Sequence, residues 1–132
     1  MFDLGSLFGL GDSQEAHRQV YNNEHQGSLT HEVIAGAAGF EAMKAYENHV
    51  RRSGQEPSHS LMKEMLAGFA AAEADKLIET KGLDYLDAEK VRHHAKAQAH
   101  RLAEEKYRGG NGYEEIINQE TIIENNDYQR EW

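Results

Sequence analysis

Ser28 to Asn48 reads SLTHEVIAGAAGFEAMKAYEN, and Ser60 to Thr80 reads SLMKEMLAGFAAAEADKLIET, so the chain repeats itself at an offset of 32 residues. The positions identical in the two copies are Ser28/Ser60, Leu29/Leu61, Glu32/Glu64, Ala35/Ala67, Gly36/Gly68, Ala38/Ala70, Glu41/Glu73, Ala42/Ala74, Lys44/Lys76 and Glu47/Glu79. Two copies are too few for a solenoid, which needs about three stacked units or more. The repeat therefore predicts two sister helices that pack against each other.

The sister segments carry the signals of two helices joined by a turn. Apolar residues within Val33–Val50 recur with a helical period. Pro57 biases the residue before it away from helix, so residues 51–58 are expected to form the turn. Helices joined by a short loop are antiparallel neighbours. We therefore predict a hairpin of helices over about 28–52 and 58–81, related by an approximate two-fold axis.

Two further helices are expected beside this hairpin. Asp12 or Ser13 can cap a helix that extends to about residue 25, and Asp84 or Asp87 can cap a helix that extends to about residue 107. The sequence thus predicts an all-α fold. We expect a four-helix arrangement, with a central antiparallel hairpin of two sequence-related helices and with extensions at both termini.

An Ala-Gly pair lies in the middle of each sister helix, at Ala35-Gly36 and at Ala67-Gly68. Glycine inside a helix costs about 1 kcal/mol relative to alanine. Its presence at equivalent positions predicts that close backbone packing requires both glycines.

Glycines divide the chain into a central domain and two extensions. Residues 1–11 alternate apolar residues with glycine and are expected to dock as an arm on the domain or on a partner subunit. Residues 12–108 form the predicted helical domain, and the acidic extension 109–132 begins with a break at Gly109–Gly112. We also expect a homodimer. The extension is predicted to dock on its own domain or on a neighbour through Ile116, Ile117, Ile122 and Ile123.

The composition disfavours several classes of protein. A formal net charge of −9 argues against nucleic acid or anionic lipid as the main partner. No apolar run is long enough to span a membrane, and the first residues lack the pattern of a secretory signal. The chain has no cysteine, which fits a cytoplasmic location. We expect no organic cofactor.

A series of motifs follows one another along the chain: AHRQVY at 16–21, EH at 24–25, THEVIAGAA at 30–38, KAYE at 44–47, His49, SH at 58–59 and ETKGLD at 79–84. In this order they resemble the fungal CipC-like antibiotic-response proteins over about residues 14–107. The resemblance implies a small intracellular fungal protein that is produced under chemical stress. It implies no established reaction and no agreed catalytic residues.

Several histidines and carboxylates are expected to converge at one end of the helical bundle. His25 ends the first helix and His31-Glu32 begins the second, while Glu79 ends the antiparallel third helix and Asp84 follows it. Imidazole with carboxylate suits Zn²⁺, Mn²⁺, Fe²⁺, Ni²⁺ or Cu²⁺. The sequence therefore predicts a divalent metal site at this end, with His93 as a further candidate ligand.

Two alternatives accompany this prediction. His31 can simply join a helix cap, and a glutamate at a helix start interacts favourably with the helix dipole. At the opposite end of the bundle, His49 and His59 flank the predicted hairpin turn and form a second, two-ligand candidate.

Two functions remain open from the sequence, and it does not decide whether the chain is an enzyme. The first is a non-catalytic stress-response protein that binds a divalent metal or a protein partner through its histidine-rich end. The second is a metal-dependent hydrolase of phosphoesters or nucleic acid, in which the metal activates water and Glu32 or Glu79 acts as the base. The first is favoured because no acid–base pair in the sequence is distinctive.

Overall fold

The computed structural model describes residues 10–22 and 29–118, and within them the chain is helical with no strand. Four helices follow one another: α1 (Leu10–Asn22), α2 (His31–Ser53), α3 (His59–Thr80) and α4 (Ala88–Tyr107). A further helical segment begins at residue 113. The predicted all-α class is confirmed, and the three long helices begin and end within three residues of the predicted bounds.

Local capping explains where the long helices begin. The hydroxyl of Thr30 accepts a hydrogen bond from the Val33 amide (3.2 Å), and the Ser58 hydroxyl accepts one from the Leu61 amide (3.0 Å). The carboxylate of Asp87 caps α4 in the same way. Each cap satisfies an amide that has no partner within the helix, which fixes the start of that helix.

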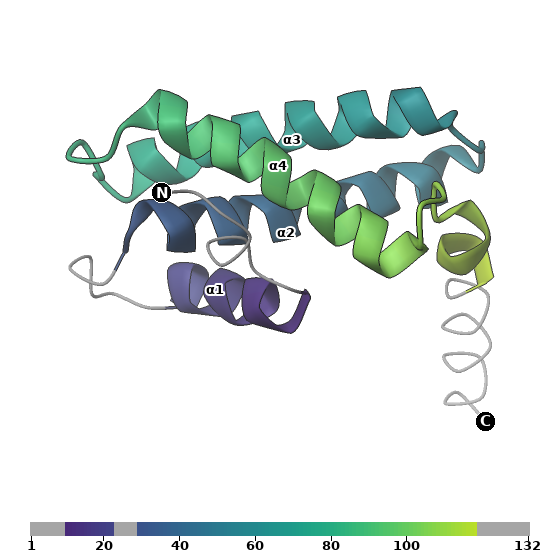
Figure 1. The fold of residues 1–132 in the computed structure, drawn as a ribbon, viewed down its shortest axis with the longest axis horizontal. Coiled ribbons are helices and arrows are strands. Elements are labelled where there is room, and N and C mark those ends of the chain that lie inside the picture. The colour runs from purple at the N-terminus through teal and green to yellow at the C-terminus, as the bar shows by residue number, and fades with distance from the viewer. Residues whose placement is uncertain (1–9, 23–28, 119–132) are drawn as a thin grey trace.

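Each of the four helices packs against at least one of the others. In Figure 1, α2 and α3 run in opposite directions and α4 crosses them, while α1 lies along α2. One hydrophobic core joins these elements, with Ile34, Leu66 and Leu102 among its fully buried members. None of the described helices has the length and apolar character needed to cross a bilayer.

The two sister glycines have different surroundings. Gly36 is buried, and its carbonyl accepts a hydrogen bond from the buried Ser13 hydroxyl of α1 (2.6 Å). Gly68 is exposed, and a Cβ built there would meet no atom within 4 Å. The prediction that close packing within the chain needs both glycines is therefore wrong for Gly68. The tight approach lies instead at Gly39, where a Cβ would come within 2.7 Å of the Gln98 side chain in α4.

The first part of the C-terminal extension packs against the helical domain. Ile116 is buried, and Ile117 packs against the core, as the sequence predicts. The Tyr46 hydroxyl donates to the carbonyl of Asn111 (2.5 Å), and the Asn111 amide donates to the Pro57 carbonyl (2.9 Å) in the turn between α2 and α3. Residues 109–118 thus pack at the end of the hairpin where the turn joins α2 to α3. The predicted contacts of Ile122 and Ile123, and residues 1–9 of the predicted arm, lie outside the described residues.

Candidate functional site

The predicted metal ligands at the α2 start lie in a helix-capping arrangement. His31 occupies the first turn of α2, and its Nε2 accepts a hydrogen bond from the backbone amide of Asp87 (3.0 Å). This bond adds to the N-terminal cap of α4. It uses one of the two nitrogens with which a histidine can bind a metal. The structure therefore shows His31 as part of a helix cap, which was the alternative to metal binding.

Among the described residues, the other predicted ligands form no group of three with His31. Backbone hydrogen bonding at the start of α2 lowers the pKa of Glu32, with smaller contributions from the Thr30 hydroxyl and nearby positive charge. Glu79 and Asp84 are exposed. Within residues 10–22 and 29–118, no group of three or more histidine, aspartate and glutamate side chains is close enough to hold a metal ion. His25 lies outside the described residues, so the predicted set that includes it stays a prediction.

The histidine that turns toward this end is His94 rather than His93. His94 is buried in α4, whereas His93 is exposed, and the two rings lie 5.9 Å apart. Burial lowers the pKa of His94, and the charges around it come from His93, Lys90, Glu32 and His31. The signal was present in the sequence, because His94 shares a helical face with Val91, Gln98 and Leu102, all of which are buried.

We expect His94 to make the fold less stable in mild acid. Its folded pKa is lower than the ordinary value of 6.5, so the unfolded chain binds its proton more readily. The contribution of neutral His94 is therefore complete above that value and is lost as the pH falls from it through the lower folded pKa. Denaturant unfolding at neutral and at mildly acidic pH should show this loss, and the His94→Gln variant should show a smaller one. An unchanged pH dependence in the variant would contradict this assignment.

The two histidines of the second candidate pair line different pockets. His49 lies beside a small pocket with Glu56, Pro57 and Leu61, whereas His59 lines a different small pocket with His100. The Nε2 of His100 is 2.9 Å from the Lys63 carbonyl, so this ring links α4 to α3. His49 and His59 flank the hairpin turn, and the two-ligand site stays a prediction.

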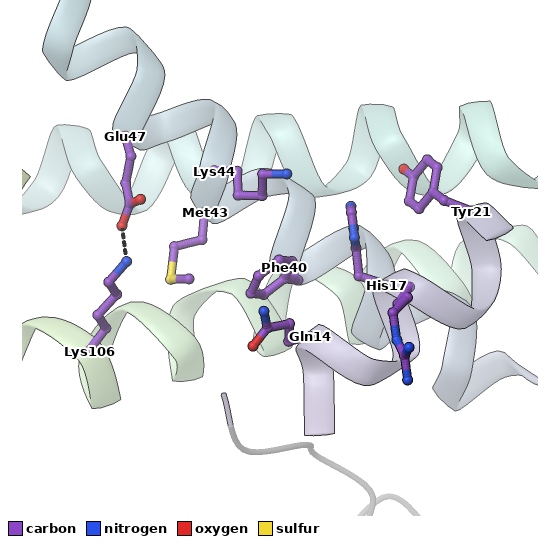
Figure 2. Close-up of a pocket in the computed structure, with 9 residues that line it drawn as sticks. Gln14, His17, Tyr21, Phe40, Met43, Lys44, Glu47 and Lys106 are labelled. Carbon is purple, nitrogen blue, oxygen red and sulfur yellow. Dashed lines mark hydrogen bonds and ion pairs between the residues drawn. The ribbon is translucent and has the colours of Figure 1, made fainter. Parts of the chain in front are cut away.

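A larger concavity than these two pockets lies elsewhere, in a groove between α1, α2 and α4. Its volume is about 540 Å³. In Figure 2 the Glu47–Lys106 pair lies at one end of this groove and Tyr21 at the other, with Met43 and Phe40 between them. The groove is lined by Gln14, His17, Arg18, Tyr21, Phe40, Met43, Lys44, Glu47 and Lys106.

His17 fixes the wall that α1 contributes. Its Nε2 lies 2.9 Å from an oxygen of Glu41 in α2. Its ring centroid is 4.4 Å from that of Tyr21 and 5.1 Å from that of Phe40. The ring bonds to a carboxylate at one edge and lies in tilted contact with two aromatic rings, which gives this side of the groove a mostly apolar wall.

The charges along the groove are mostly paired. Arg18 contacts both oxygens of Glu15, and Lys106 donates to a Glu47 oxygen at 2.7 Å. Glu47 also accepts a hydrogen bond of 2.5 Å from the hydroxyl of Tyr107. Burial, followed by the bond to Glu47, raises the pKa of Tyr107, so that this hydroxyl stays a donor at neutral pH.

Lys44 is the exception among these charges. It is exposed at the rim of the groove, and among the side chains that the structure describes it has no hydrogen-bond or ion-pair partner. The groove therefore combines an apolar body with one cation that is not already neutralised.

Sequence reasoning missed this groove because it searched for metal ligands. The lining residues of α1 recur at i, i+3, i+4 and i+7 from Gln14 to Tyr21, and those of α2 recur in the same way from Phe40 to Glu47. Such spacing places each set on one helical face. The faces of α1 and α2 both mix aromatic and cationic residues, and this shared pattern in the sequence could have indicated a common binding surface.

Comparison with known proteins identifies a family. A family model described as virulence factor CipC-like matches residues 16–106. The match covers every lining residue of the groove except Gln14. Searches of curated proteins and of solved structures returned no match.

Proposed function

The chain belongs to the CipC-like family of virulence factors, and we propose that it serves a chemical-stress response by binding a small molecule in the groove between α1, α2 and α4. The observation that carries this proposal is the groove itself. Its volume of about 540 Å³ is in the range of small-molecule sites, which are mostly apolar and have a few placed polar groups. Its apolar wall and its unneutralised lysine meet that description.

The lining indicates what kind of molecule fits. Phe40 and Met43 offer apolar surface between the helices, and His17 adds a flat ring beside them. Lys44 can meet one negative charge without breaking an existing ion pair. We therefore infer that the ligand is a small aromatic molecule with a single carboxylate or similar anionic group.

The same lining favours binding over catalysis. As formed by the described residues, the groove has no serine, threonine or cysteine to act as a nucleophile. The His17–Glu41 pair resembles an acid–base pair, yet its ring lies in tilted contact with Tyr21 and is bonded to Glu41 in a way that supports α1. Its role in this proposal is to hold the groove open.

Titration calorimetry with naphthoate tests the proposal. We expect saturable binding, and much weaker binding of naphthylmethanol, which has the same ring system without the charge. Lys44→Gln should weaken naphthoate binding by about tenfold, because a charge-assisted hydrogen bond is lost. Lys96→Gln, on an exposed part of α4 outside the groove, is the matched control and should change nothing. No binding of naphthoate, or equal binding by Lys44→Gln, would refute the proposal.

The metal site and the metal-dependent hydrolase stay predictions, since they depend on His25. Because the Nε2 of His31 is engaged by the Asp87 amide, a cation there would have to take the Nδ1 of His31 together with Glu32. Metal analysis of the purified chain and of His25→Ala and His31→Ala would test the site. Phosphodiester hydrolysis with and without chelator would test the enzyme. The cytoplasmic location expected from the lack of cysteine also stays a prediction.

A further inference from the structure

The sister helices each contain more than two turns without a polar side chain. The two stretches are Val33–Phe40, VIAGAAGF, and Met65–Ala72, MLAGFAAA. Since a helix turns once in 3.6 residues, eight consecutive apolar residues cover every side of it. A helix that is apolar all round is normally buried all round.

Only α2 meets that expectation. Every residue of Val33–Phe40 is buried or half-buried. The covering element is α1, whose Ser13 hydroxyl binds the Gly36 carbonyl and whose His17 ring packs on Phe40. Leu29, at the start of this face, is 2% exposed.

The corresponding side of α3 has no such cover. Leu61, the counterpart of Leu29, is 45% exposed, and Gly68 and Ala72 are exposed as well. Met65 is half-buried. We call Leu61, Met65, Gly68 and Ala72 the outer face of α3. Within the described part of the chain, no element covers this side of α3 in the way that α1 covers α2 (Figure 1).

We propose that the outer face of α3 binds the outer face of α3 in a second copy of the chain, across a two-fold axis. Glu64, Gly68, Ala72 and Lys76 are four residues apart in turn, so they form one diagonal row, and all four are exposed. Rows of this kind interdigitate when helices pack. The two small residues at the centre allow the backbones to approach closely.

The charges of this row make it complementary to itself. Glu64 and Lys76 lie at equal distances from the midpoint of Gly68 and Ala72, on opposite sides. In an antiparallel pair of copies, each Glu64 therefore meets the Lys76 of the other copy, as an isologous interface requires. Within one chain the two residues are about 18 Å apart along the helix, too far to pair.

This interface is separate from the proposed ligand site. The groove is lined by α1, α2 and α4, and none of its lining residues belongs to α3. Two copies joined through α3 would each keep an open groove, so the interface and the groove can be tested independently.

Sedimentation equilibrium of the full chain tests the interface. We expect a dimer, and we expect Gly68→Arg to be a monomer with unchanged helix content. The substitution does not harm the fold, because a Cβ at this helical position meets no atom within 4 Å and arginine favours helix more than glycine does. Glu105→Lys, on an exposed part of α4, is the control for added positive charge and should remain a dimer.

Charge exchange tests the orientation of the two copies. Glu64→Lys and Lys76→Glu should each weaken the dimer by about tenfold or more, since each replaces two attractive contacts with two repulsive ones. The double variant restores both contacts in exchanged form and should return to within about threefold of the original affinity. A monomeric full chain, a dimer that survives Gly68→Arg, or a double variant no better than the single ones would overturn the proposal.

Discussion

Replacing Glu47 with alanine is expected to lower the free energy of unfolding by about 3 kcal/mol, because it leaves a buried hydroxyl and two half-buried cations without their acceptor. The Glu47 side chain is 8% exposed. It accepts hydrogen bonds from Lys106 and Tyr107 at the end of α4, and Arg51 lies 3.7 Å away on the other oxygen. Urea unfolding of the variant and of the original chain measures the loss.

A double-mutant cycle separates the hydrogen bond from the rest of this loss. Tyr107→Phe removes the hydroxyl that donates to Glu47 and should cost about 1 kcal/mol, the usual value for one hydrogen bond. Once Glu47 is alanine, the same substitution should cost little or nothing, since the hydroxyl then has no carboxylate to bind. Equal costs in the two backgrounds would show that the pair does not stabilise the fold as described.

The Glu47 cluster also links the fold to the proposed ligand site. Glu47 and Lys106 both line the groove, and their ion pair closes one end of it (Figure 2). Glu47→Gln would leave Lys106 without its counter-charge while keeping a polar side chain of similar size. A groove with a second free cation would bind an aromatic anion more tightly, so stability and affinity are expected to change in opposite directions.

The three long helices were predictable from sequence because their limits depend on neighbouring residues, whereas α1 begins at Leu10, before its predicted caps. Thr30, Ser58 and Asp87 each cap a helix through an amide three positions further on, which a reader of the sequence can recognise. The repeat likewise revealed that α2 and α3 are sisters. It could not reveal that α1 covers only one of them, since that depends on contacts between segments far apart in the chain.

The candidate site was harder to predict for the same reason. His31 was expected to bind a metal, but its partner is a backbone amide of Asp87, and every residue offers such a group. The groove depends on how α1 lies on α2. Ser13 contacts Gly36, which is 23 positions away, and His17 contacts Glu41, which is 24 positions away. Residue types alone do not disclose such pairings.

Gly39→Leu is expected to destabilise the fold by about 3 kcal/mol, because α2 and α4 touch at this position. A Cβ at Gly39 would lie 2.7 and 2.9 Å from the Cγ and Cβ of Gln98 and 3.1 Å from the backbone nitrogen of Ala99. Gln98 is buried and the nitrogen belongs to a helix, so neither moves without shifting α4. Gly39→Ala should lose less, about 1 to 2 kcal/mol, although alanine favours helix.

Gly68→Ala is the matched control, because it makes the same change in the sister helix, where space is open. Measured at concentrations too low for association, it should gain up to about 1 kcal/mol from helix propensity alone. Thermal or urea unfolding of the two alanine variants should therefore give changes of opposite sign. If Gly39→Ala also stabilised the chain, α2 and α4 would not approach as closely as described, and the buried Gln98 would not be held between them.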